Sequence, residues 1–267
     1  MTRHRLIPPA YLARFADEAG QVLVEARDRS RRLLASAEAA ADRAGTFVVA
    51  GGGAAPAAVE ALLERVEGRG VAAIERLGAG AFPPTGEDRA NVALLVALLL
   101  LRGRQHQAGV VAVSSYLSQA LTQGTPATTG GAAAPVVAEL RSRPDPVRLV
   151  LSTVPELARL LSARTWQLVV FPRRVLLTGD TPAVLWTRAR APLPFGIRLG
   201  VADEIRVPLS PRHALILARH APAGEVVREL GDRHAAALNR TVAEAAEEWM
   251  YYHPASDPME AVELSPP

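Results

Sequence analysis

The sequence VALLVALLLL, residues 92–101, is the most apolar run in the chain. Glu87 precedes it, and Arg102 and Arg104 follow it, so acid and base stand at the ends where each stabilises a helix dipole. The run is too short to cross a bilayer, which takes about 20 apolar residues. A helix that is apolar on every side is instead covered by protein all round. We therefore expect a long central helix over residues 87–106, buried under the rest of the chain.

Composition excludes several kinds of chemistry. The chain has 267 residues, of which 49% are hydrophobic and 21% charged, a balance that is typical of a folded protein. It has no cysteine, which excludes a disulfide, a thiolate nucleophile and a cysteine-bound zinc. It also has no lysine, which excludes a Walker A motif and a Schiff base.

Net charge and the N-terminus bear on partners and location. The formal charge of +3 is only weak evidence for a nucleic-acid partner. The first residues have basic side chains but no apolar segment of the kind found in secretory signals. We therefore expect a cytoplasmic protein without a membrane segment.

Strands and helices are predicted in groups along the rest of the chain. Apolar positions at helical spacing predict a helix that begins at Pro56 and a closing helix over residues 225–248. Short β-rich runs bounded by glycine, proline or aspartate predict strands. These strands lie at residues 21–26, 33–36, 46–50, 166–171, 175–177, 183–187, 205–209, 214–218 and 250–253, with further helices at 110–121 and 146–161.

This grouping favours an α+β fold over a regular βαβ alternation. We expect a single domain over residues 1–253, in which a mixed or antiparallel sheet packs around the long buried central helix. Strands from both ends of the chain should meet in it. Residues 254–267 are acidic and rich in proline, and we expect them to form a flexible C-terminal tail.

Six motifs follow one another in order from the first residues to the closing helix. They are HRLIPPAYLARF (4–15), VEALLERVEGRGVAAIERL (59–77), RANVALLVALLLLRGRQHQ (89–107), WQLVVFPRRVLLTGDTPAVLW (166–186), IRVPLSPRHALIL (205–217) and LNRTVAEAAEEWMYY (238–252).

Together these motifs resemble a mainly bacterial family, the domain of unknown function 4238. The resemblance covers residues 4–252, and it implies a fold rather than an activity, because the family has no established one. Two positions depart from the family pattern. Arg5, not His4, stands on the usual histidine, and Gly179 replaces the serine that commonly precedes Asp180.

Asp180 is the most suggestive candidate for chemistry. It follows a strand in the sequence Thr178-Gly179-Asp180-Thr181-Pro182. A carboxylate at the end of a buried strand is well placed as a metal ligand or general base. The alternative is a turn, in which aspartate caps its own backbone and proline restarts the strand.

Basic residues near the N-terminus and after the central helix are the other candidates. His4, Arg5 or Arg14 would face Asp180 if the first motif and the Asp180 turn meet across a polar pocket. Arg102 and Arg104 could bind phosphate, as Arg5 could, because guanidinium groups match phosphate geometry. Charges that merely complement a helix end explain Arg102 and Arg104 equally well.

Two other patterns are better explained as turns. Gly51–Gly53 before a helix imitates a dinucleotide-binding loop, but Pro56 stands at the third glycine position. Ser210 lies close to His213 without the Gly-x-Ser-x-Gly sequence that surrounds a hydrolase nucleophile.

Two functions remain open from the sequence. The first is a non-enzymatic binding or accessory protein with a protein or RNA partner, favoured by the absence of any complete catalytic signature. The second is a hydrolase acting on a phosphodiester or nucleotide, in which Asp180 holds a metal or acts as base and Arg14 or Arg102 stabilises phosphate. The sequence identifies no cofactor and no second acid for a metal site. Convergence of His4, Arg14 and Asp180 in an open pocket would favour the hydrolase.

Overall fold

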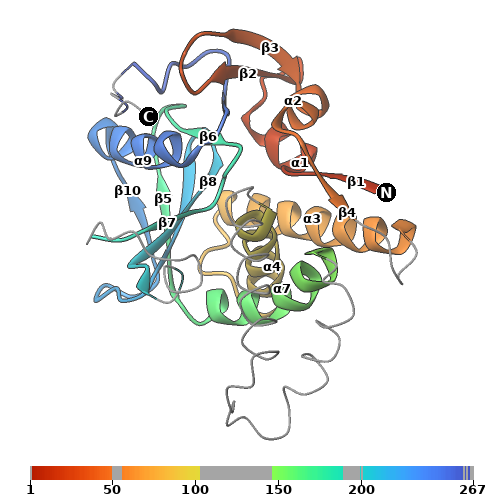
Figure 1. Cartoon of the computed structure of the whole chain (residues 1–267). Coiled ribbons are helices and arrows are strands. Elements are labelled where there is room, and N and C mark those ends of the chain that lie inside the picture. The colour runs from red at the N-terminus through yellow and green to blue at the C-terminus, as the bar shows by residue number, and fades with distance from the viewer. Residues whose placement is uncertain are drawn as a thin grey trace, which may run out of the picture.

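One buried helix lies among five other helices and three sheets in the described part of the chain. This computed structural model describes residues 2–49, 56–102, 146–188, 199, 201–260, 262 and 264. They form six helices and sheets of five, four and two strands, which confirms the α+β class. The helix predicted at 110–121 lies outside the described residues. Figure 1 shows three groups of elements: the five-stranded sheet with α9, the helices α3, α4 and α7, and the N-terminal strands with α1 and α2.

The central helix is α4 (Gly86–Arg102), and it is buried as the sequence predicts. Of residues 91–102, all are buried except Leu94, which is partly exposed. Two long helices, α3 (Pro56–Gly78) and α7 (Pro146–Ser162), pack directly against it. The core that includes α4 also contains side chains from the N-terminal segment and from both large sheets. A helix without a polar face thus lies at the centre of the main core.

The five-stranded sheet has the order β10-β5-β9-β8-β7. It is antiparallel except for the parallel pair of β10 and β5. Alternate side chains of its strands enter different cores: Trp166 and Leu168 join the α4 core, whereas Val169 packs with residues of α9. The strands are β5 (Thr165–Val170), β7 (Val184–Trp186), β8 (Glu204–Ser210), β9 (His213–Ala218) and β10 (Val226–Glu229).

The predicted closing helix is wrong in its first part. Residues 226–229 form β10, and the helix α9 begins only at Asp232 and ends at Ala245. Gly224, with φ of 71°, precedes β10, and Gly231, which caps α9, separates the strand from the helix. The strand forms because β5 offers a free edge for parallel pairing, a contact between segments far apart in sequence.

The four-stranded sheet brings the two ends of the chain together, as expected. Its order is β3-β2-β11-β6, and all its pairs are antiparallel. Trp249 of the C-terminal strand stands opposite Ala26 of the N-terminal strand. The strands are β2 (Gln21–Ala26), β3 (Arg32–Ser36), β6 (Leu177–Gly179) and β11 (Trp249–Tyr252).

Short elements of the first 49 residues pack against this sheet and the long helices. Ser36 caps the helix α2 by accepting a hydrogen bond from the N–H of Ala39 at 3.2 Å. The other elements are β1 (Thr2–Arg5), α1 (Pro9–Leu12), the 3-10 turn η1 (Ala13–Phe15), α2 (Ala37–Ala44) and β4 (Thr46–Val49), which pairs with β1.

The segment that begins at Pro254, expected as a flexible tail, places apolar side chains against α9. Met259 is fully buried and Val262 is 5% exposed, and both pack in a cluster with Val242. Among the described helices, none is long and apolar enough to cross a membrane.

Candidate functional site

The carboxylate of Asp180 accepts three backbone hydrogen bonds. Oδ1 accepts from the N–H of Glu247 at 2.7 Å, and Oδ2 accepts from Glu248 at 2.7 Å and Trp249 at 3.0 Å. The residue is 7% exposed. Asp180 therefore caps the segment that joins α9 to β11, 67 to 69 residues further along the chain. This is the geometry of a structural anchor, and a catalytic role for Asp180 stays a prediction.

The N-terminal motif and the Asp180 turn do meet, through Tyr11 and Thr178. The Tyr11 hydroxyl donates to the carbonyl oxygen of Pro208 at 2.5 Å and lies 3.0 Å from Thr178 Oγ1. Both side chains are fully buried. Burial raises the pKa of Tyr11, so the hydroxyl keeps the proton that this bond requires. The contact joins three of the six motifs, and none of the predicted site residues takes part in it.

Arg14 contacts β8, the strand that also accepts the Tyr11 hydroxyl. Its Nε donates to the carbonyl oxygen of Leu209 at 2.7 Å, and one terminal nitrogen lies 3.4 Å from Oε1 of Glu75 on α3. Its side chain is 13% exposed, and burial lowers the Arg14 pKa while Glu75 opposes that shift. These are its polar contacts among the described residues, so Arg14 and Asp180 are not joined.

Ser210 and His213 form a pair within the β8–β9 turn. Ser210 Oγ lies 2.9 Å from His213 Nδ1 and also accepts the N–H of Arg212 at 3.3 Å. Burial, then the charges of Arg14 and Arg212, lower the pKa of His213, so the imidazole is neutral at pH 7. By accepting the N–H of Arg212, the Ser210 hydroxyl stabilises its own turn. This agrees with the interpretation of Ser210 and His213 as part of a turn.

The remaining N-terminal candidates lie in and near β1. His4 is placed by its backbone, opposite Phe47 of β4. Arg5 forms an ion pair with Asp42 of α2 at 2.7 Å. Among the described residues its side chain makes no other polar contact. The structure therefore does not join Arg5 to Asp180.

Arg5 and Arg102, both predicted to bind phosphate, line one cavity of about 810 Å³. Arg5 is paired with Asp42, and Arg102 is paired with Glu67 at 2.5 Å. Two arginines face four carboxylates here, a formal charge of −2, which disfavours a phosphate. Arg104 lies outside the described residues. The lining of this acidic cavity comprises Arg5, Pro8, Pro9, Ala10, Ala13, Glu38, Asp42, Thr46, Leu63, Glu64, Glu67, Gly68 and Arg102.

A second cavity, of about 570 Å³, gathers three arginines that the sequence analysis did not select. It lies where the loop after β5, the β8–β9 turn, the first turns of α9 and the segment after β11 come together. Arg173 and Arg174 lie in the loop after β5 and Arg212 lies in the β8–β9 turn, so no single motif points to the cavity. We call this the arginine cavity; it is lined by Arg173, Arg174, Val175, Arg212, Asp232, Ala235, Ala236, Asn239, Ala255, Ser256, Asp257, Pro258 and Glu260.

The walls of the arginine cavity are tied together by Asn239 of α9. Its Nδ2 donates to the carbonyl oxygens of Val175 at 2.7 Å and Pro258 at 3.3 Å, and its Oδ1 accepts from the N–H of Leu177 at 3.2 Å. The side chain is almost fully buried, at 2% exposure. One amide therefore fixes the loop after β5 and the C-terminal segment relative to each other.

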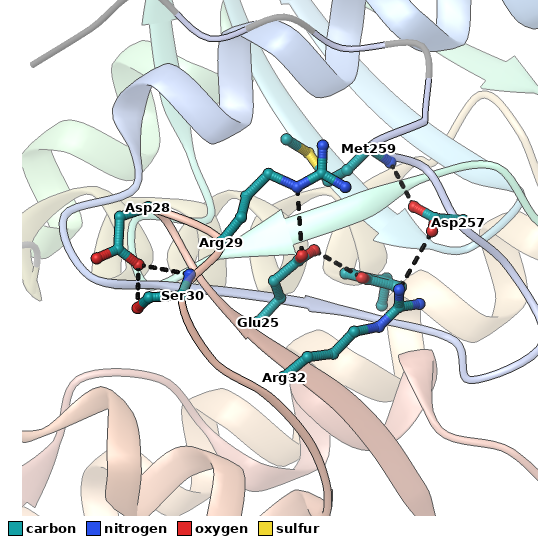
Figure 2. Close-up of polar contacts among 8 residues, drawn as sticks. Glu25, Asp28, Arg29, Ser30, Arg32, Asp257 and Met259 are labelled. Atoms are coloured by element: carbon teal, nitrogen blue, oxygen red, sulfur yellow. Dashed lines mark hydrogen bonds and ion pairs between the residues drawn. The ribbon is translucent and has the colours of Figure 1, made fainter.

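Figure 2 shows how the C-terminal wall of the arginine cavity is held to the four-stranded sheet. Arg32 of β3 donates to Asp257 Oδ2 at 3.2 Å, and Asp257 Oδ1 accepts the N–H of Met259 at 3.3 Å. Beside them lies the buried Glu25. Its carboxylate accepts the Tyr252 hydroxyl at 2.7 Å. Burial and then Glu25 raise the pKa of Tyr252, so the hydroxyl remains a donor to this carboxylate. Asp257 thus already has a cationic partner outside the cavity lining.

Among the described residues, no group of three or more histidine, aspartate or glutamate side chains is placed to hold a metal ion.

Comparison with known proteins bears on the family. The comparisons with curated proteins and with solved structures found no match. A family model described as "Protein of unknown function (DUF4238)" matches residues 3–256, which include all six motifs. The chain therefore belongs to the DUF4238 family.

Proposed function

We propose that this chain is a non-enzymatic binding or accessory protein that acts in the bacterial cytoplasm. The observation that carries the proposal is the engagement of Asp180. Both oxygens of its carboxylate accept backbone N–H groups, and only 7% of the residue is exposed. A metal ligand or general base needs lone pairs that the substrate or ion can reach.

The arginines required by the hydrolase alternative are engaged as well. Arg14 donates to the Leu209 carbonyl and pairs with Glu75, and Arg102 pairs with Glu67. An arginine that stabilises a phosphate in a transition state must direct its donors at the reacting group. These contacts direct the donors at the protein instead, which supports binding over hydrolysis.

Phosphodiester hydrolysis is the test that separates the two functions. The full chain is incubated with bis(p-nitrophenyl) phosphate and either Mg²⁺ or Mn²⁺, and release of p-nitrophenol is followed by absorbance. We expect the wild type to match the protein-free blank with either metal. Turnover above the blank that disappears in Asp180→Asn, while Asp42→Asn retains it, would establish the hydrolase instead. Far-ultraviolet circular dichroism of both variants shows whether a loss of turnover reflects a loss of fold.

A further inference from the structure

We propose that the arginine cavity binds a phosphate group of its ligand through Arg174 and Arg212. This inference rests on the proposed binding function and names its site and ligand chemistry. Arg174 follows β5, Arg212 lies in the β8–β9 turn, and both line the cavity of about 570 Å³. Both side chains are exposed, so a ligand that enters the cavity can reach them.

The charges that line the cavity leave these two arginines in excess. The lining has three arginines and three carboxylates, but two of the carboxylates are already paired. Asp232 pairs with Arg173, and Asp257 pairs with Arg32 from outside the lining. Only Glu260 then opposes Arg174 and Arg212, and within the described residues neither guanidinium has a hydrogen-bonded or ion-paired partner.

Backbone contacts hold the two arginine-bearing segments side by side. The N–H of Phe171 donates to the carbonyl oxygen of Arg212 at 2.8 Å. The N–H groups of Val175 and Leu176 both donate to the carbonyl oxygen of Pro211, at 2.9 and 3.0 Å. The two arginines are therefore fixed at adjacent backbone positions before any ligand arrives, which lowers the entropic cost of binding.

Phosphate fits this arrangement better than a carboxylate or a metal ion does. A phosphate group has enough oxygens to accept from two guanidinium groups that approach from different sides. Within the described residues, a metal ion would meet two guanidinium groups without a partner and a single carboxylate, Glu260, that is not already paired. The acidic cavity has a formal lining charge of −2, so it does not compete for the same ligand.

The phosphate could belong to a free nucleotide or to RNA, and one titration distinguishes these sources. The full chain is titrated into a short fluorescein-labelled oligo-uridine RNA at low salt, and binding is followed by fluorescence anisotropy. ATP, inorganic pyrophosphate and poly-L-glutamate are then added as competitors. Competition by ATP identifies a nucleotide-sized ligand, and binding of RNA without competition by ATP identifies the polymer; both outcomes support the phosphate assignment.

Substitutions locate the binding in the cavity. We expect Arg174→Ala and Arg212→Ala each to weaken RNA binding about tenfold, and the double variant about a hundredfold, with unchanged urea midpoints. The double variant should also lower the slope of log Kd against log salt by about 1.4, the value for two phosphate contacts on a single strand. Arg240→Ala removes the same charge from an exposed position of α9 outside the cavity and should leave binding within about twofold of the wild type.

Three results would overturn the phosphate site. The first is an equal loss of affinity in Arg240→Ala, which would show non-specific attraction to positive charge. The second is full competition by poly-L-glutamate at equal charge, which would assign the cavity to acidic proteins. The third is no binding of RNA, ATP or pyrophosphate at all. None of these results implies phosphodiester turnover. The failure of this inference is therefore distinguishable from the failure of the proposed function, which only turnover would show.

Discussion

Asp180 shows what a single residue contributes to this fold. Its carboxylate satisfies three N–H groups at the point where α9 ends and β11 begins. Gly179 beside it allows the close approach, because a Cβ there would lie 3.1 Å from the Cβ of Ala246. The sequence indicates a carboxylate at the end of a strand, but it cannot indicate which backbone that carboxylate meets, since the partners lie 67 to 69 residues away.

Replacing Asp180 tests its role as an anchor. Asp180→Asn puts an amide donor against N–H donors in a buried site, so we expect the free energy of unfolding to fall by about 2–4 kcal/mol. Asp42→Asn, at a carboxylate that is 60% exposed, should cost about 0–1 kcal/mol. Urea denaturation of the two variants measures the difference. Equal, small losses would show that the three bonds to Asp180 do not hold the fold.

The lowered pKa values of two histidines predict how the free energy of unfolding depends on pH. Burial is the main cause that lowers the pKa of both His213 and His253, with nearby arginines as the second cause. In the unfolded chain each titrates near the ordinary value of 6.5. Below that pH the unfolded state binds more protons than the folded state, so this part of the stability is complete above pH 6.5 and is lost as pH falls.

The measurement is the free energy of unfolding in urea from about pH 7.5 to about pH 5.5. We expect it to decrease as pH falls, and to decrease less in His253→Asn. Asparagine keeps an acceptor for the N–H of Ala255, which His253 Nδ1 accepts at 3.1 Å. Stability that is constant or higher at the lower pH would contradict this prediction.

Among the elements, the helix pair α3 and α4 depends on a close approach at Gly70. A Cβ at this position would lie 2.6 Å from the Cβ of Leu95, so alanine forces the two helices apart. We expect Gly70→Ala to lower the free energy of unfolding by about 1–3 kcal/mol. Gly68 lies on the same helix with open space around it, and Gly68→Ala should raise stability by about 0.5–1 kcal/mol. Thermal unfolding compares the pair, and shifts of the same sign would refute the packing argument.

The elements that could be predicted are those that depend on their local sequence alone. The helix α4 was predictable because residues 92–101 are apolar in every direction, a property of the local sequence alone. The strand β10 was not, because Val226 and Val227 suit a helix face as well as a strand until β5 supplies the parallel partner. Gly224 and Gly231 were the available signal, since they bracket the strand.

At the scale of the whole molecule, the C-terminal segment completes both a core and a cavity wall. Met259 and Val262 pack with Val242, and Pro258 accepts a hydrogen bond from Asn239. We expect a chain that ends at His253 to lose about 3 kcal/mol or more of stability, because it exposes apolar surface and removes one of the two carbonyl acceptors of the buried Asn239 amide. Urea denaturation checks this, with the exposed substitution Glu260→Ala as control. An unchanged midpoint in the shortened chain would support the flexible tail instead.

The arginine cavity could not be predicted because it exists only in the assembled molecule. Four segments contribute to it, and each arginine looks like any other in a chain where every long basic side chain is arginine. The sequence could predict that the N-terminal motif and the Asp180 turn meet, but not that Tyr11 and Thr178 make the contact. It predicted Arg5 and Arg102 as phosphate-binding candidates, but it could not predict that Asp42 and Glu67 pair with them in the fold.

Binding of a ligand without cleavage is what distinguishes the proposed function from a hydrolase. The most direct test follows one sample of labelled oligo-uridine RNA with an excess of wild-type protein and Mg²⁺, first by anisotropy and then, after prolonged incubation, on a denaturing gel. We expect raised anisotropy and full-length RNA. Shortened RNA would contradict this expectation, because the chain would then be a hydrolase, and unchanged anisotropy would remove RNA as the ligand.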